Sequence, residues 1–161
     1  MMRADRRVSE VLDQHRQEVD EHGWSVVEVS GGGRRALPFA HTVGLDRAGH
    51  PELLVSGRGS AEAEVLLGSL ADAVLAGRRF HVGDVLRSAP WPPLLLLRVT
   101  APEALVAAQA MLGSDEPVPA LQVVWADEAG RWPWDPAWVT SARDQQLFAR
   151  APKIAEPRTF A

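Results

Sequence analysis

Cysteine is absent from the 161 residues. Without a thiol the chain cannot form disulfides, thiolate zinc sites or iron–sulfur clusters, and it cannot use a cysteine nucleophile. We therefore expect a protein of a reducing compartment, the cytoplasm, that is stabilised by its core alone. A chain of this length can bury such a core as a single domain spanning residues 1–161.

Long hydrophobic runs are also missing. The most apolar stretch, Leu94–Leu97, is far too short to cross a bilayer, and the charged N-terminal segment lacks the apolar centre of a signal peptide. We expect a soluble protein with no membrane partner. Positive charge is not concentrated either, because 17 basic residues stand against 21 acidic ones and the arginines are scattered. A nucleic-acid partner needs concentrated positive potential against phosphates, so none is expected.

Tyrosine is absent, whereas tryptophan occurs six times, five of them between Trp91 and Trp138. Packing is the first role expected, because tryptophan buries a large area with only one donor to satisfy. The segment RWPWDPAW, which holds Trp132 and Trp134, allows two interpretations. It is either an aromatic platform for a ligand or partner protein, the latter using residues 125–138, or a lid over the sheet edge.

Hydrophobic periodicity predicts three helices, in segments 8–23, 60–77 and 102–113, each ending at a glycine. A short terminal helix is expected in 141–150, followed by a flexible tail from about residue 151. Five strand-like runs separate these helices: WSVVEVS, LPFAHTVGL, ELLVSG, LLLLRVT and ALQVVWAD. No repeat or long linker divides the chain. The expected fold is α+β, one domain with a mostly antiparallel sheet packed with about three helices, and a barrel-like sheet is the alternative.

Two titratable residues in PFAHTVGLDRAGHPELLVSG are candidates for catalysis. Strand alternation puts His41 on the same face as Phe39 and Val43, where it is either a poised base or a hydrogen-bonded core residue. Glu52 opens a buried strand, and a carboxylate there needs a partner, such as an arginine, or a chemical role.

Imidazole and carboxylate groups in this part of the chain could also bind a metal. The spacing contains no HxH, HxxxH or HExxH pair that would force two ligands onto one side of an element. No metal is therefore favoured, and a metal-assisted hydrolase using His41, His50 and Glu52 stays an alternative hypothesis. The full set of ligands considered is His41, His50, Glu52, His81 and Asp84.

A glycine-flanked arginine follows the third strand-like run. Gly57, Arg58 and Gly59 lead into Ser60, which begins a predicted helix. Backbone amides at a helix N-terminus attract anions, and glycines let a phosphate approach closely. The alternative is that Ser60 only caps the helix and the glycines only make a turn.

The chain resembles the bacterial domain-of-unknown-function family numbered 4262, over about residues 22–136. Five segments carry the resemblance in order: HGWSVVEV, PFAHTVGL, HPELLVSG, LLGSLADAVLAGRRFHVGD and LQVVWADEAGRWPWDP. The family name implies no established activity. His41 stands where the family has tyrosine, so the resemblance implies a packing and hydrogen-bonding role for it. The motif positions matched are Thr42, Gly44, Pro51, Glu52, Gly57, Gly83, Asp127, Pro133 and Trp134.

The leading functional hypothesis is a domain, enzyme or not, that binds a small anionic molecule beside the TVGL, PEL and GRGS segments. The order of elements also resembles split-barrel flavin-binding domains, which makes flavin a cofactor to test, with no residue carried over. A homo-oligomer is left open. The predicted ligand-binding residues are Thr42, Gly57, Arg58, Gly59, Ser60, Trp132 and Trp134.

Overall fold

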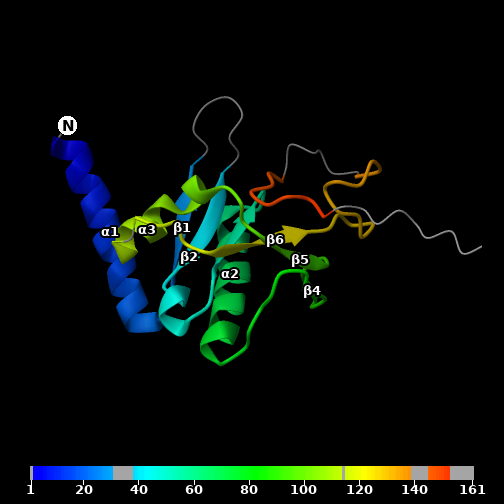
Figure 1. Ribbon diagram of the computed structural model, residues 1–161, viewed down its shortest axis with the longest axis horizontal. Coiled ribbons are helices and arrows are strands. Elements are labelled where there is room, and N and C mark those ends of the chain that lie inside the picture. The colour runs from blue at the N-terminus through cyan, green and yellow to red at the C-terminus, as the bar shows by residue number, and fades with distance from the viewer. Residues whose placement is uncertain (1, 31–37, 114, 139–144, 153–161) are drawn as a thin grey trace, which may run out of the picture.

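The computed structural model describes residues 2–30, 38–113, 115–138 and 145–152. Helices and strands of this part of the chain are arranged around one sheet (Figure 1). The α-helices are α1 (Met2–His22), α2 (Ser60–Leu75) and α3 (Val106–Leu112), and two 3₁₀ helices are η1 (Leu45–Ala48) and η2 (Pro102–Leu105). The strands are β1 (Ser25–Val29), β2 (Phe39–Val43), β3 (Glu52–Ser56), β4 (Val85–Leu86), β5 (Leu94–Arg98) and β6 (Ala120–Trp125).

The predicted α+β domain with three helices is confirmed. Its first helix begins at Met2 instead of residue 8, because the charged N-terminal residues continue the helix beyond its buried stripe. The described part of the predicted terminal helix, residues 145–150, is not helical. Most of the predicted flexible tail, from residue 153 on, lies outside the described residues. No helix among those described is long and apolar enough to cross a bilayer.

The six strands form one sheet in the order β1-β2-β3-β6-β5-β4. All neighbouring strands are antiparallel except β3 and β6, which pair in parallel at the centre, with Glu52 opposite Ala120. The sheet is open, with β1 and β4 at its two edges, so the barrel-like alternative is wrong. The parallel pair brings the starts of β3 and β6 to the same end of the sheet.

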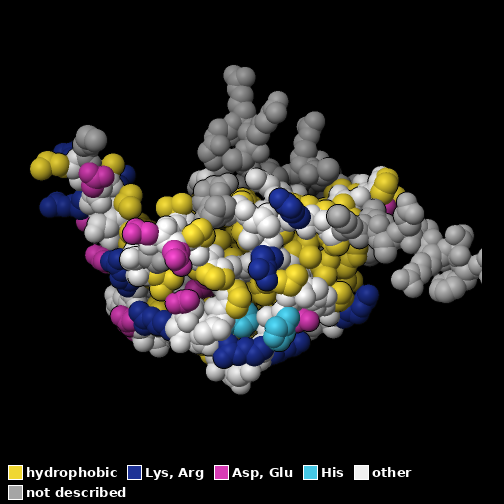
Figure 2. Space-filling view, viewed as in Figure 1, with side chains coloured by type: hydrophobic (Ala, Val, Ile, Leu, Met, Phe, Trp, Pro, Cys, Tyr) yellow, Lys and Arg dark blue, Asp and Glu magenta, His cyan; other side chains and the backbone are white. Residues whose placement is uncertain are grey.

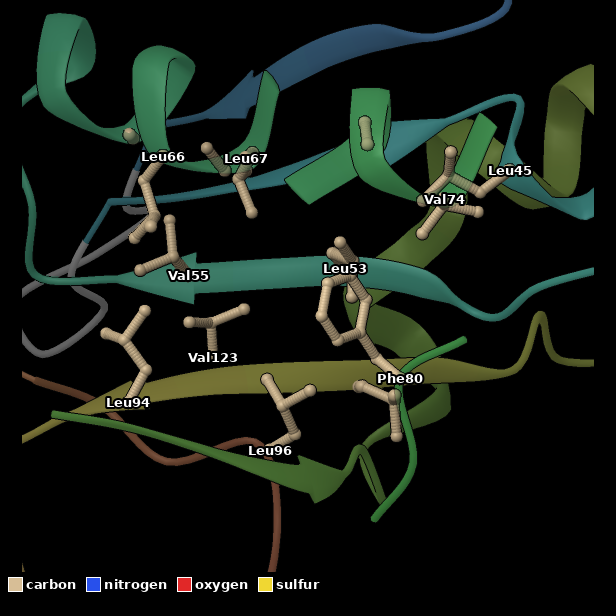
Figure 3. Close-up of a cluster of buried hydrophobic side chains, with 14 of the residues drawn as sticks. Leu45, Leu53, Val55, Leu66, Leu67, Val74, Phe80, Leu94, Leu96 and Val123 are labelled. Carbon is tan, nitrogen blue, oxygen red and sulfur yellow. The ribbon is translucent and has the colours of Figure 1, made fainter. Parts of the chain in front are cut away.

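One face of the sheet is covered by α2, as Figure 3 shows. Leu66 and Leu67 of α2 point toward β3, where Leu53 and Val55 are buried. Burying each such aliphatic side chain contributes about 1.5–3 kcal/mol, so this layer supplies much of the stability of the fold. Beyond the reach of α2, the same face is closed by Trp125 at the end of β6 and by loop side chains that include Phe80, Trp91 and Trp138.

The opposite face carries α1 and α3. Val19 of α1 packs with Val27, Val43 and Leu54 of the sheet, while α3 adds Ala108. Over β5 and β6 the cover changes to Leu147 and the two remaining tryptophans of the predicted segment, Trp132 and Trp134. The sheet is therefore covered on both faces, which explains the apolar runs Leu53–Val55, Leu94–Leu97 and Val123–Trp125 in its strands.

Candidate functional site

A cavity of about 880 Å³ opens at the end of the sheet where β3 and β6 begin. Because β5 is antiparallel to β6, β5 ends at this same place, and its last residue and the three after it enter the wall. Four chain segments line the cavity: 49–51, 79–82, 98–101 and 117–121. None of them is adjacent to another in the sequence, so the site exists only through the strand order.

The floor of this cavity is apolar and its rim is basic. Val118, Leu121 and Phe80 are buried at the floor, while Arg79 and Arg98 are exposed side chains of the lining. On the face seen in Figure 2, hydrophobic side chains gather over β5 and β6, and histidine and Lys or Arg side chains border them below. The arrangement suits a molecule with an apolar body and a negative group.

The two arginines differ in how they are held. Arg79 donates through its guanidinium to the carbonyl of Ala48 at 2.8 Å. Arg98 makes no hydrogen bond and no ion pair with any described residue, so all five of its guanidinium N–H donors remain available. His81 lies at the same rim and is close to a carboxylate, with 3.9 Å between its Nδ1 and Asp84.

His50 lines the cavity wall, and both of its ring nitrogens are hydrogen-bonded. Its Nδ1 donates to the carbonyl of Pro51 at 2.7 Å, and its Nε2 accepts from the backbone N–H of Phe80 at 3.0 Å. These partners require the neutral ring with the proton on Nδ1. The ring also meets the Phe80 ring edge-on, 5.9 Å between centroids. His50 therefore joins two loops and is not placed as a base or metal ligand.

Glu52 is buried at the start of β3 and caps η1. Its Oε1 accepts from the backbone N–H groups of Gly44, at 3.0 Å, and Asp46, at 3.2 Å. Its Oε2 accepts from the Thr42 hydroxyl at 2.6 Å, and that hydroxyl accepts from the N–H of Leu53 at 2.9 Å. No ion pair to an arginine is present in the described residues. Burial raises the pKa of Glu52 to about 7 in spite of these donors.

His41 is buried on the face covered by α1, as strand alternation predicts. Its Nδ1 lies 3.0 Å from the carbonyl of Thr42, and its Nε2 has no partner among the described residues. Burial lowers the pKa of His41, so the neutral ring is favoured. Neither His41 nor Glu52 lines the large cavity. Their catalytic roles stay predictions, and the contacts seen account for both as packed, hydrogen-bonded groups.

The metal hypothesis predicts that His41, His50 and Glu52 converge. Within the described residues, no group of three or more His, Cys, Asp or Glu side chains is arranged to hold a metal ion. His50 uses both ring nitrogens in hydrogen bonds to the backbone, and Glu52 accepts hydrogen bonds from three donors.

The predicted anion turn lies at the other end of β3 from the large cavity. Gly59, not Ser60, is the N-cap of α2, and Ser60 donates through its hydroxyl to Glu28. Arg58 lies over the Trp125 ring, 4.2 Å from its centroid, and donates to Glu62 at 3.2 Å. The turn borders a cavity of about 230 Å³. Thr42 and Glu52 thus come together, while the glycine-flanked arginine is separated from them by the length of a strand.

The predicted aromatic platform is half-buried. The Trp132 and Trp134 rings stack on each other, 6.0 Å between centroids and 17° between planes, and pack against β5 and β6. Trp138 packs against Trp125 with 5.5 Å between ring centroids. All three thus have packing roles in their own domain, and their ligand or partner roles stay predictions.

Sequence reasoning named His50 and His81 of the cavity wall only as metal-ligand candidates, and it missed the arginines and the apolar residues of the large cavity. These residues come from separate loops and strand ends: Arg79, Phe80, Arg98 and Val118. Apart from the neighbours Arg79 and Phe80, no two of them lie in the same short stretch of sequence. Only the order β3-β6-β5 could have found them, because it decides which loops meet at one end of the sheet.

Comparison with known proteins gives a family but no activity. No curated protein and no solved structure matches the chain. A family model described as a domain of unknown function matches residues 18–139, which include the region of the predicted resemblance. The match covers most of the chain, so the protein belongs to the DUF4262 family.

Proposed function

We propose that this protein binds a small amphipathic anion in the cavity of about 880 Å³ at the starts of β3 and β6. The observation that carries the proposal is Arg98, a guanidinium without a protein partner among the described residues beside an apolar floor. An arginine in this setting binds a carboxylate or phosphate through paired hydrogen bonds. Arg79 adds positive potential at the same rim.

The apolar part of the ligand has a preformed place. Val118 and Leu121 are held by β6 and the segment before it, and Phe80 is fixed by the hydrogen bond from its N–H to His50. Cavities of a few hundred to about 1,000 Å³ with few polar groups are typical of small-molecule sites. The proposal concerns binding, and it assigns no reaction to the site.

Calorimetric titration with three probes of equal chain length tests the proposal: octanoate, octyl phosphate and octylammonium. We expect the anions to bind and the cation not to bind, and the stronger anion tells which head group the site prefers. Arg98→Gln should weaken anion binding about tenfold, because it removes a charge-assisted pair of hydrogen bonds. Arg87→Gln, at an exposed arginine outside the cavity, is the matched control. Equal binding of octanoate and octylammonium would overturn the proposal.

The predicted anion turn provides a second location for the same ligand. Its cavity is smaller, and both of its polar side chains, Arg58 and Ser60, already contact carboxylates. We therefore favour the larger cavity. Arg58→Ala combined with Ser60→Ala should leave the octanoate affinity unchanged. Loss of binding in this double variant, with full binding in Arg98→Gln, would move the ligand to the turn.

The remaining functional hypotheses have simple tests. A purified sample that is colourless and does not respond to added FMN argues against a flavin.

A stoichiometric metal in elemental analysis would support the metal-assisted hydrolase. For the interaction module, replacing Trp132 and Trp134 together by alanine should abolish capture of a partner without changing octanoate binding.

A further inference from the structure

The N-terminal half of α1 extends past the sheet that its C-terminal half covers. Every described residue from Met2 to Val11 is exposed, whereas Val19 is buried and His15 is partly buried against the sheet. Figure 1 shows this half of the helix projecting at one end of the molecule. Most helices in proteins owe their stability to packing of an apolar face, so an unpacked half needs a partner.

An apolar stripe runs along this projecting half. Ala4, Val8 and Val11 follow one another at intervals of four and three residues, which places them on one side of the helix. Val8 is 60% exposed and Val11 51%. The stripe continues the face that holds Val19 against the sheet, so its orientation is fixed by the domain itself.

More apolar surface lies where α1 meets α3. Leu112 of α3 is partly exposed and lines, with Arg16 and Val19, a small crevice between the two helices. Leu112 thus adds an exposed apolar side chain beside the C-terminal half of α1. Exposed apolar side chains that gather on one side of a domain mark an interaction site.

Charge along α1 is divided between its two halves. From Met2 to Ser9 there are three arginines and one aspartate, a net charge of +2. From Glu10 to His22 there are five acidic residues and one arginine, a net charge of −4 with the histidines neutral. Two such helices that run antiparallel and cross near Val8 place Arg3 and Arg6 of each copy beside Asp13 and Glu10 of the other, within about one Debye length.

We propose that a second copy of this chain docks on the stripe, with the two α1 helices antiparallel and crossing near Val8. A two-fold axis through Val8 makes the stripe complementary to itself, as symmetric dimers require. The acidic half of α1 disfavours an anionic membrane surface as the occupant. The division of charge along α1 thus favours docking with the α1 helix of a second copy that runs in the opposite direction.

Sedimentation equilibrium of the full chain tests the docking. We expect a dimer at micromolar concentration that Val8→Glu combined with Val11→Glu converts to a monomer, shifting the dissociation constant by at least a hundredfold. Val65→Glu is the matched control, because Val65 is 62% exposed on α2, away from the stripe. Circular dichroism checks that the helix persists in each variant. A wild-type monomer at all concentrations, or a dimer unaffected by the double variant, would overturn the proposal.

Single cysteines test the direction of the helices, since the chain has no cysteine of its own. In the antiparallel pair, Val8→Cys faces its own copy and should form a disulfide-linked dimer under mild oxidation. Ala4→Cys should not, because two Ala4 positions lie about 12 Å apart along the helix axis. Equal cross-linking at both positions would indicate parallel helices and contradict the proposal.

Discussion

Glu52 and His41 are two buried titratable residues on neighbouring strands, and their protonation equilibria oppose each other. Burial raises the pKa of Glu52 from 4.5 to about 7 and lowers that of His41 below 6.5. Relative to the unfolded chain, the folded chain takes up a proton at Glu52 and releases one at His41. In mildly acidic solution the effects of Glu52 and His41 on the free energy of unfolding have opposite pH dependence and partly cancel. The effect of each residue is therefore measured best in a variant that lacks the other.

In the wild type, we expect the free energy of unfolding to fall as pH rises because of Glu52, and Glu52→Gln should abolish this fall. Between pH 4.5 and 7 the folded protein holds the Glu52 proton more tightly than the unfolded chain, so the free energy of unfolding falls as pH rises through this window. The fall amounts to about 3 kcal/mol. The glutamine oxygen can accept from Gly44 and Asp46, and its amide can donate to Thr42, so we expect equal or higher stability at pH 8.

Urea unfolding from pH 5 to 8 measures this effect. Glu64→Gln, at an exposed carboxylate of α2, is the control and should leave the slope unchanged. A Glu52→Gln variant with the wild-type slope would show that Glu52 does not bind the proton.

His41→Phe should make the protein more tolerant of acid. The unfolded chain binds a proton at His41 as pH falls below 6.5, while the buried ring resists it and His15 of α1 adds repulsion. The free energy of unfolding therefore falls with pH in the wild type, and this part of the fall should disappear in the variant. Thermal unfolding at pH 5 and 7 measures it, with His22→Gln as the exposed control. An unchanged difference between the two pH values would contradict the expectation.

At the scale of elements, the link between β2 and η1 depends on one glycine. Gly44 has φ +109°, and a Cβ there would lie 2.7 Å from the carbonyl oxygen of Gly23 and 2.9 Å from Val19. The carbonyl belongs to the backbone that follows α1, so it cannot move aside as a flexible side chain could. Gly44 thus lets α1, β2 and the Glu52 cap approach one another closely.

Gly44→Ala should lower the free energy of unfolding by about 2–4 kcal/mol, through strain at positive φ and the clash with Gly23. Gly49→Ala is the matched control, because Gly49 also has positive φ, +69°, but nothing lies within 4 Å of its added Cβ. It should cost only about 1–2 kcal/mol. An equal decrease in the free energy of unfolding in the two variants would show that the close approach to Gly23 does not contribute to the cost of Gly44→Ala.

Most of the elements follow from local sequence, with residues 145–150 as an exception because they are not helical, whereas the site does not. Helical periodicity predicts α1, α2 and α3, and alternation places His41 on the correct face of β2. Nothing local predicts that β3 pairs in parallel with β6, since that choice depends on which apolar surfaces cover each other. The buried environment of Glu52 is predictable from its position at the start of ELLVSG. Its partners are mostly backbone N–H groups, however, and these leave no mark in a sequence.

At the scale of the whole molecule, stability should be highest at the centre of the sheet. β3 and β6 are each paired on both sides and covered on both faces, whereas β4 has two residues and one neighbour. We expect hydrogen exchange to be slowest for Leu53–Val55 and Val123–Val124, near the rate set by global unfolding, and fast for Leu86. Exchange at β4 as slow as at β6 would show that the loops around β4 are far more stable than their burial suggests.

The central parallel pair also determines the order in which the strands of the sheet can assemble during synthesis. Glu52 pairs with Ala120, a residue 68 positions further along the chain, whereas β1, β2 and β3 are near neighbours in sequence. During synthesis the first three strands and α2 emerge together and can associate locally, while the outer edge of β3 waits for β6. Until then the nascent chain carries an unpaired apolar strand edge, so we expect chains that end before residue 120 to be the forms of this protein most prone to aggregation.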